Sequence, residues 1–295
     1  IGIDAGQTLQ RIPSVVYWAG LGRLGIRHFR GSRDAYHRKF DSFQKGDIDR
    51  DPSWDPGLPA CPTDFPEGTT LQLSEEESRY LKERFSRSGE STLSKLLLDQ
   101  PKIITAQFPW EHPAVVNLPE TNRIRRWVDH AWCFSEITHG AILLYNLMIA
   151  ESIGNHDWIE RYNHDLAVWG ELIDSRSDAF AAWELDEFWR LTCETNARIR
   201  LTSQRFANSW IELTKSQRTT AEVASMPDAR SLIAKREHQL KGLKSKLHNP
   251  EQQSRWNGDA GSGMGRLDFR WRITNEVVTD IMNGLGQGAK NATSA

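Results

Sequence analysis

Residues 120–151 constrain the fold more than any other stretch, because they carry a helical pattern that changes character halfway along. The first half is amphipathic, with an apolar side made of Ile124, Trp127, Val128, Ala131 and Ile137. The second half contains the run AILLYNLMIA at 141–150, which is apolar on nearly every side. Such a helix must be surrounded by other elements. The pattern predicts one long central helix, and the run is too short to span a bilayer, which needs roughly 20 residues.

Shorter helices are expected around the central one, from helical spacing and from signals at their ends, such as Ser74 and Glu77, which form a capping box. They span residues 13–24, 32–43, 74–85, 92–98, 157–173, 184–193, 203–216, 225–247 and 275–284. Residues 267–271 are expected to form a short strand-like piece before the last helix. The predicted fold class is therefore mainly α, a multi-helix domain with little β structure.

Two proline-rich stretches are predicted to be loops that wrap this domain. Five of the twelve prolines lie between residues 52 and 66, and a second group punctuates residues 108–113. Proline lacks a backbone N–H and resists the interior of a helix. We expect Trp54, Leu58 and Phe65 to dock the first loop onto the domain.

Composition divides the chain into sections. These are a basic N-terminal helical section (1–45), proline-rich loops with short helices (46–118), an acidic helical core (119–225), a basic helix with a glycine-rich loop and a final helix (226–285), and a tail (286–295). The chain begins with Ile1 rather than Met, so we expect a segment to precede it.

The net charge of −2 hides a strong segregation of charge along the chain. Residues 1–50 hold nine basic and five acidic residues, and residues 226–272 hold ten and five, whereas the net charge of residues 51–225 is −10. If the two basic ends share a face, they form a surface suited to nucleic acid. The alternative is that they are solvated helix faces that balance the acidic middle of the same molecule.

Candidate nucleic-acid contacts follow from this charge layout. The predicted phosphate contacts are Arg23, Arg27, Arg30, Lys241, Lys244, Arg266 and Arg270. The predicted stacking residues lie beside arginines and are Trp18, Trp256 and Trp271. The other tryptophans recur at helical spacing and are expected in the core.

Other chemistries have weaker support in the sequence. The three cysteines are far apart and form no CxxC pair, which disfavours disulfides and a cysteine zinc site and fits a reducing cytoplasm. Glu136 and His139 reproduce half of a di-iron Glu-x-x-His pattern, but the second half is missing. We therefore predict no metal, no cofactor and no catalytic residue, and favour a protein that is not an enzyme.

Several segments resemble an uncharacterised bacterial domain-of-unknown-function family over nearly the whole chain. They are LQRIPS at 9–14, YWAGL at 17–21, FPWEHP at 108–113, RWNG at 255–258 and GRLDFRW at 265–271. The resemblance implies a further N-terminal segment and a gene neighbourhood of helicases and phospholipase-D-like proteins. It supplies no catalytic residues, but it favours a role linked to DNA.

Taken with the charge segregation, the resemblance predicts a cytoplasmic, DNA-associated accessory protein of a bacterial anti-phage or DNA-processing complex. The expected partners are DNA and a helicase or nuclease encoded nearby, and no membrane is expected. One alternative is a protein–protein scaffold for a helicase-type partner. A third hypothesis is a metal-dependent enzyme centred on Glu136 and His139.

Overall fold

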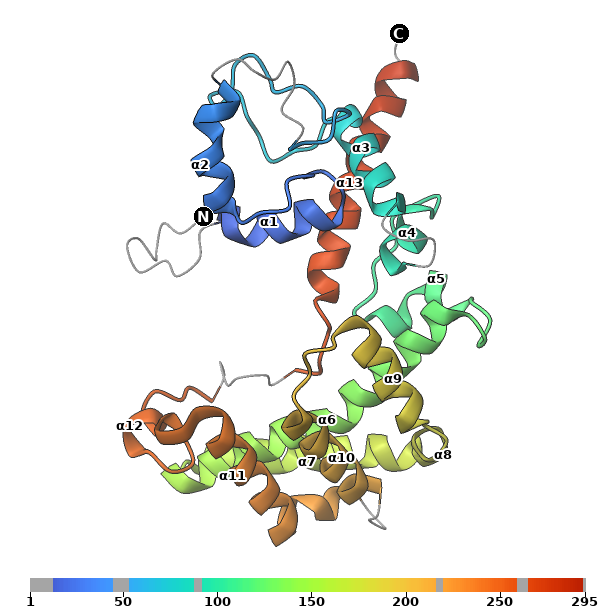
Figure 1. Cartoon of the computed structure of the whole chain (residues 1–295). Helices are drawn as coiled ribbons and strands as arrows, with labels where there is room; N and C mark the ends of the chain where they lie inside the picture. The colour runs from blue at the N-terminus through green and yellow to red at the C-terminus, as the bar shows by residue number, and fades with distance from the viewer. Residues whose placement is uncertain (1–12, 45–52, 88–91, 216–219, 259–264, 294–295) are drawn as a thin grey trace. The chain divides into compact units, whose positions relative to one another are not determined.

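The computed structural model describes residues 13–44, 53–87, 92–215, 220–258 and 265–293 (Figure 1). These residues form thirteen α-helices and three short 3-10 helices, and their only β pairing is an isolated bridge between Arg27 and Trp54. The prediction of a mainly α fold is confirmed. The chain divides into two compact units, which we describe separately. Unit 1 comprises Ile1–Gln107, Glu111–Asn117 and Arg270–Ala295, and unit 2 comprises Phe108–Trp110 and Leu118–Phe269.

Unit 2 is built around α6, the predicted central helix. Its elements are α6 (Arg123–Ile153), α7 (His156–Ser175), α8 (Ser177–Ala181), α9 (Leu185–Thr195), α10 (Leu201–Lys215), η3 (Thr220–Ser225), α11 (Pro227–Lys241), η4 (Gly242–Lys244) and α12 (Pro250–Gln253). The side chain of Asn122 caps the start of α6 by accepting a hydrogen bond from the backbone N–H of Ile124. Gly154 ends the helix with a φ of 68°.

The core of unit 2 surrounds the second half of α6, as its apolar pattern predicts. Ile137, Leu144 and Ile149 are completely buried. Tryptophans of two neighbouring helices reach the same turn of α6: Trp169 of α7 donates to the carbonyl of Glu136, and Trp210 of α10 donates to that of Ile137, each at 2.8 Å. By length and composition α6 could cross a membrane, but 72% of its most apolar window is buried inside the structure.

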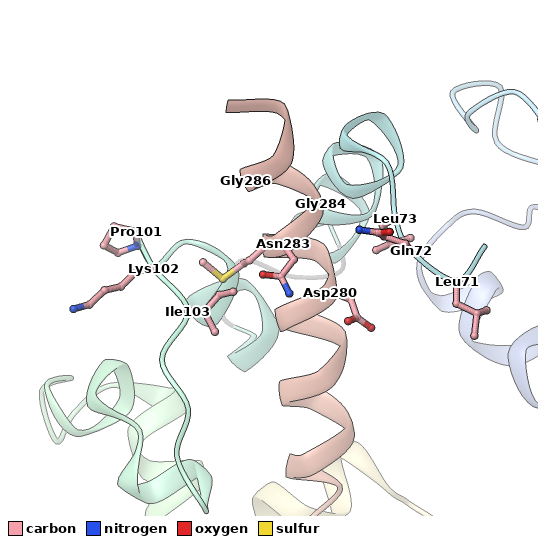
Figure 2. A pocket seen from close by; sticks show the side chains of 11 residues that line it. Leu71, Gln72, Leu73, Pro101, Lys102, Ile103, Asp280, Asn283, Gly284 and Gly286 are labelled. Carbon is pink, nitrogen blue, oxygen red and sulfur yellow. The ribbon is translucent and has the colours of Figure 1, made fainter. Parts of the chain in front are cut away.

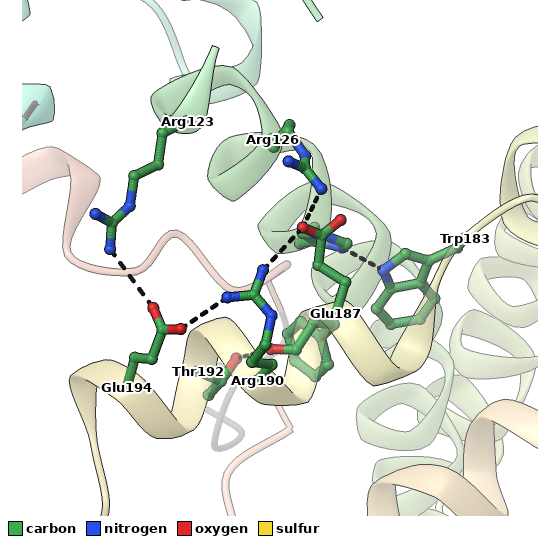
Figure 3. Close-up of polar contacts among 9 residues, drawn as sticks. Arg123, Arg126, Trp183, Glu187, Arg190, Thr192 and Glu194 are labelled. Atoms are coloured by element: carbon green, nitrogen blue, oxygen red, sulfur yellow. Dashed lines mark hydrogen bonds and ion pairs between the residues drawn. The ribbon is translucent and has the colours of Figure 1, made fainter. Parts of the chain in front are cut away.

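A polar network joins α9 to the first turns of α6 (Figure 3). Glu187 accepts hydrogen bonds from Arg126 and, at 3.2 Å, from Arg190, and a second oxygen lies 3.3 Å from Nε2 of His130. The Nδ1 atom of His130 accepts a hydrogen bond of 2.9 Å from the indole N–H of Trp183. Because Nδ1 accepts, Nε2 carries the hydrogen and can donate it to Glu187. Arg126 and Arg190 of unit 2 are therefore engaged by a structural partner within the fold.

Unit 1 contains the first helices and the last one. Its elements are α1 (Pro13–Arg23), α2 (Arg33–Gln44), α3 (Glu75–Arg87), α4 (Leu93–Leu98), α5 (Pro113–Val116) and α13 (Trp271–Thr293), and η2 (Pro109–Glu111) lies where the chain passes from one unit to the other. The capping box that opens α3 is confirmed, because Ser74 and Glu77 exchange hydrogen bonds between side chain and backbone. Its core packs Leu97 and Leu98 of α4 against Ile281 of α13.

Close approach between α3 and α13 depends on a glycine. A Cβ atom at Gly284 would lie 2.0 Å from Oγ of Ser78 and 2.9 Å from the carbonyl oxygen of Leu73. No side chain larger than hydrogen fits there without a shift of α13 away from α3.

The structure corrects four predicted details. The helix expected over 225–247 stops at Lys241, because Gly242 takes a φ of 52° and turns the chain. Residues 267–271 are not a strand: Phe269 and Arg270 have positive φ and lead directly into α13. The final helix continues to Thr293, so the predicted tail at 286–295 is helical over most of its length. Leu58 and Phe65 do not dock, since they are 45% and 59% exposed.

Candidate nucleic-acid interface

The predicted phosphate contacts are divided between the two units. Arg23, Arg27, Arg30 and Arg270 belong to unit 1, whereas Lys241, Lys244 and Arg266 belong to unit 2.

An aromatic cluster underlies the first basic section of unit 1. The ring centroid of Tyr36 lies 5.5 Å from those of Trp18 and Phe29 and 5.9 Å from that of Trp54. The indole N–H of Trp54 donates to the hydroxyl of Tyr36 at 2.8 Å, which confirms the predicted docking of Trp54. Four rings at tilted and edge-on angles make a rigid support for the residues around them.

Cations are concentrated over and around this aromatic cluster. The guanidinium of Arg27 lies 4.4 Å from the Trp18 ring centroid, and its Nε donates to the Trp18 carbonyl at 3.1 Å. The amine of Lys39 lies 5.7 Å from the Phe29 ring. We define the basic segment as Arg23, Arg27, Arg30, Arg38 and Lys39. It faces a single acid within residues 23–39, Asp34, and Asp34 is paired with Arg33.

Arg23 and Arg30 are the predicted phosphate contacts of this segment that remain open to solvent. Both are exposed, and neither has an ion pair among the residues that the structure describes. Trp18 is only half-buried, but Arg27 covers its ring and its N–H donates to the carbonyl of Gly31. The aromatic side chain open to solvent is its neighbour Tyr17, at 60% exposure. Tyr17 is not among the predicted stacking residues, and its only signal in the sequence is its position beside Trp18.

The late basic section partly balances the acidic middle of the chain, as the alternative interpretation predicts. Arg230 forms a bidentate pair with Glu151, at 2.5 and 3.0 Å. Lys241 donates to the hydroxyl of Tyr145 at 3.2 Å and lies 3.6 Å from Glu237. Lys244 is exposed and has no ion pair within the described parts of the chain.

Arg266 is bound inside unit 2 rather than presented to a ligand. Its Nη1 donates to Oε1 of Glu136 at 2.6 Å, and its guanidinium lies 4.2 Å from the ring of Phe108. Arg176 approaches the same carboxylate at 4.0 Å. Two guanidinium groups around Glu136 compete with any metal ion there, and no group of three or more His, Cys, Asp or Glu in the described residues could hold one. The arrangement therefore does not support the hypothesis of a metal-dependent enzyme centred on Glu136 and His139.

Two of the three predicted stacking residues lie in hydrophobic cores. Trp256 is 8% exposed and donates to the side chain of Asn146 at 3.1 Å. Trp271 is 3% exposed and donates to the carbonyl of Ala106 at 2.9 Å. Arg270, which precedes Trp271, is exposed at the start of α13. Of the predicted glycine-rich loop, residues 259–264 lie outside the described residues, and Gly258 packs against the ring of Trp158.

A groove of about 480 Å³ runs beside α13 in unit 1 (Figure 2). Its walls come from residues 71–73 and 101–103 and from the second half of α13. Its charged lining side chains, among the residues described, are Lys102 and Asp280, and Figure 2 shows the Lys102 amine pointing away from Asp280. This groove assembles no constellation suited to acid–base or nucleophilic chemistry.

Comparison with known proteins gives one result. A family model described as a family of unknown function, DUF6361, matches residues 1–284. No curated protein and no solved structure matches the chain.

Proposed function

We propose that this chain, which belongs to the DUF6361 family of unknown function, is a DNA-associated accessory protein without catalytic activity of its own. The observation that carries the proposal is the basic segment of unit 1, in which exposed arginines adjoin a rigid aromatic cluster. Its bacterial partners would be DNA and a helicase or nuclease of an anti-phage or DNA-processing complex. The chemistry of the segment supports the DNA part of this proposal.

Phosphate contacts of this kind bind without reading sequence. Arginine donates to phosphate oxygens through a planar fork, and each neutralised phosphate releases counterions from the duplex. The backbone between Arg27 and Arg30 is held by residue 53, because the Ser53 carbonyl accepts from the N–H of His28 and of Phe29. A fixed backbone reduces the entropy lost when the arginines engage DNA.

The test is fluorescence anisotropy with labelled single- and double-stranded DNA, titrated across salt. We expect an affinity that weakens steeply with salt. The double variant Arg23→Glu and Arg30→Glu should bind at least about tenfold more weakly, and the slope of log K against log salt should flatten by about two. The matched control is Arg198→Glu with Arg205→Glu, which reverses two exposed arginines of unit 2.

Two results would overturn the proposal. The first is no binding of either DNA at low salt. The second is an equal loss in the control variant, which would assign the effect to bulk charge. If DNA binding is absent while a neighbouring helicase or nuclease co-purifies, the scaffold alternative replaces it.

A further inference from the structure

The end of α11 presents two leucines to solvent on a turn that the fold holds firmly. Leu240 is 61% exposed and Leu243 is 90% exposed. They are three residues apart, on either side of Gly242, whose φ of 52° ends the helix and is accessible without strain to glycine. Exposed leucines on flexible loops are common, but the turn at residues 242–247 is extensively bonded.

The buried carboxylate of Glu237 holds the turn at residues 242–247 through hydrogen bonds. Glu237 is 5% exposed and accepts hydrogen bonds from the hydroxyls of Tyr145 and Ser245, at 2.7 and 2.6 Å. It also accepts from the backbone N–H groups of Lys246 and Leu247, at 2.7 and 3.0 Å. Burial opposes the charge of Glu237, but these hydrogen bonds outweigh it, so its pKa lies below the ordinary value.

A residue that follows the turn, Asn249, also restrains it. The side chain of Asn249 donates to the carbonyl of Leu243 at 2.8 Å and caps α12 with its oxygen. Four hydrogen bonds therefore restrain a turn that carries Leu243, an apolar side chain that is 90% exposed. Pre-organisation of this kind lowers the entropy that a partner must overcome on binding.

The surroundings of the two leucines are cationic and hollowed. Lys235 and Lys244 are exposed, and neither has an ion pair among the described residues. Burial, and secondarily the charge of Lys241, lower the pKa of Lys246. A groove of about 830 Å³ opens beside Leu243 and is bordered by Lys235 and His238. A groove of this size accepts side chains, and Lys235 at its border favours an acidic ligand over a basic one.

We propose that the α11 tip, defined as Lys235, Leu240, Leu243 and Lys244, is a docking surface for an acidic segment of a partner protein that carries large apolar side chains. Apolar side chains of that segment would cover the two leucines and enter the groove, and its carboxylates would face the two lysines. This surface lies in unit 2 and shares no residue with the basic segment, so it stands or falls independently of the proposed DNA contact.

The experiment is selection of phage-displayed random peptides on the full chain, followed by affinity measurements with the enriched peptides. We expect enrichment of peptides with net negative charge and at least one large apolar residue. The double variant Leu240→Ser and Leu243→Ser should weaken them at least about tenfold. The double variant Lys235→Glu and Lys244→Glu should also bind these peptides more weakly than the wild type. The difference in affinity between this variant and the wild type should become smaller in high salt, which screens the charges. The matched control Leu201→Ser changes a leucine of unit 2 that is 58% exposed.

Four outcomes would overturn this inference. They are no enriched peptide, enrichment of neutral or basic peptides, affinity unaffected by the leucine changes, and equal loss in Leu201→Ser. A leucine variant that loses DNA affinity instead of peptide affinity would assign the tip to nucleic acid. Since both leucines are exposed, thermal melting should be unchanged and should separate lost binding from lost folding.

Discussion

Arg266 reaches across 130 residues of sequence to donate a 2.6 Å hydrogen bond to Glu136, whose carboxylate is 1% exposed. The residues next to this pair are also joined by a hydrogen bond: the hydroxyl of Ser135 donates to the carbonyl of Leu267 at 2.9 Å. Two consecutive side chains of α6 thus hold two consecutive residues of the segment that follows the glycine-rich stretch. Arg266, which the charge pattern predicts to contact DNA, is therefore a structural residue of unit 2.

Arg266→Ala should destabilise the protein by about 3 kcal/mol, because it leaves the buried carboxylate of Glu136 with only the more distant Arg176. Chemical denaturation measures the loss. Adding Glu136→Gln to Arg266→Ala should recover part of it, since the buried charge is then removed. The control is Arg161→Ala, which removes a half-exposed arginine. Equal destabilisation by both single variants would contradict this role for Arg266.

Gly140→Ala should cost about 1–3 kcal/mol, because the added Cβ would lie 2.2 Å from the ring of Trp169. The indole is held there by its hydrogen bond to the Glu136 carbonyl and cannot move aside freely. Urea unfolding provides the measurement. In a Trp169→Leu background the same glycine change should be much less harmful, and an undiminished cost there would show that the contact with Trp169 is not its cause.

Stability should fall with acid partly through Glu237. Its pKa in the folded protein is below the ordinary value, so the stabilisation is present above the unfolded pKa of about 4.3 and disappears as the pH falls through the folded pKa. Glu237→Gln should lower stability at pH 7 by about 1–3 kcal/mol and flatten its decline below pH 5. Glu251→Gln, which changes a carboxylate that is 71% exposed, should do neither. Parallel pH profiles for wild type and Glu237→Gln would refute this assignment.

The cysteines should differ sharply in reactivity. Burial raises the pKa of the Cys133 thiol to about 12, and the residue is 5% exposed, whereas Cys61 is exposed. Iodoacetamide at pH 8 should therefore alkylate Cys61 in the folded protein and reach Cys133 only after denaturation. Peptide mass spectrometry distinguishes the two. Alkylation of Cys133 at a rate like that of Cys61 would show that unit 2 opens under native conditions.

Most helices could be predicted because their signals are local. The capping box at Ser74 and Glu77 and the apolar pattern of α6 depend on residues a few positions apart. The errors arose where a local pattern was ambiguous. The alternating run before Trp271 resembled a strand, and Gly242 gave no sign in the sequence that it would end α11 rather than continue it.

The candidate interface was less predictable, because an arginine beside a tryptophan in the sequence does not show whether the tryptophan is buried by other elements. Trp256 and Trp271 each directly follow an arginine in the sequence, and Trp18 contacts Arg27 in space. Of these three tryptophans, only Trp18 has a guanidinium over its ring among the contacts described. Trp256 and Trp271 are buried by elements that lie far away in the sequence, through bonds to Asn146 and Ala106. Spacing along one helix contains no information about such partners.

The sequence by itself determined the helical class, the central position of α6 and the segregation of charge, because hydrogen bonding within a helix and the period of its apolar face are local properties. Only the tertiary structure decided which cations remain available. It bound Arg266 to Glu136 and left Arg23, Arg30 and Lys244 exposed. The reason is that a side chain's partner is set by the packing of whole helices, which depends on contacts between residues more than a hundred positions apart.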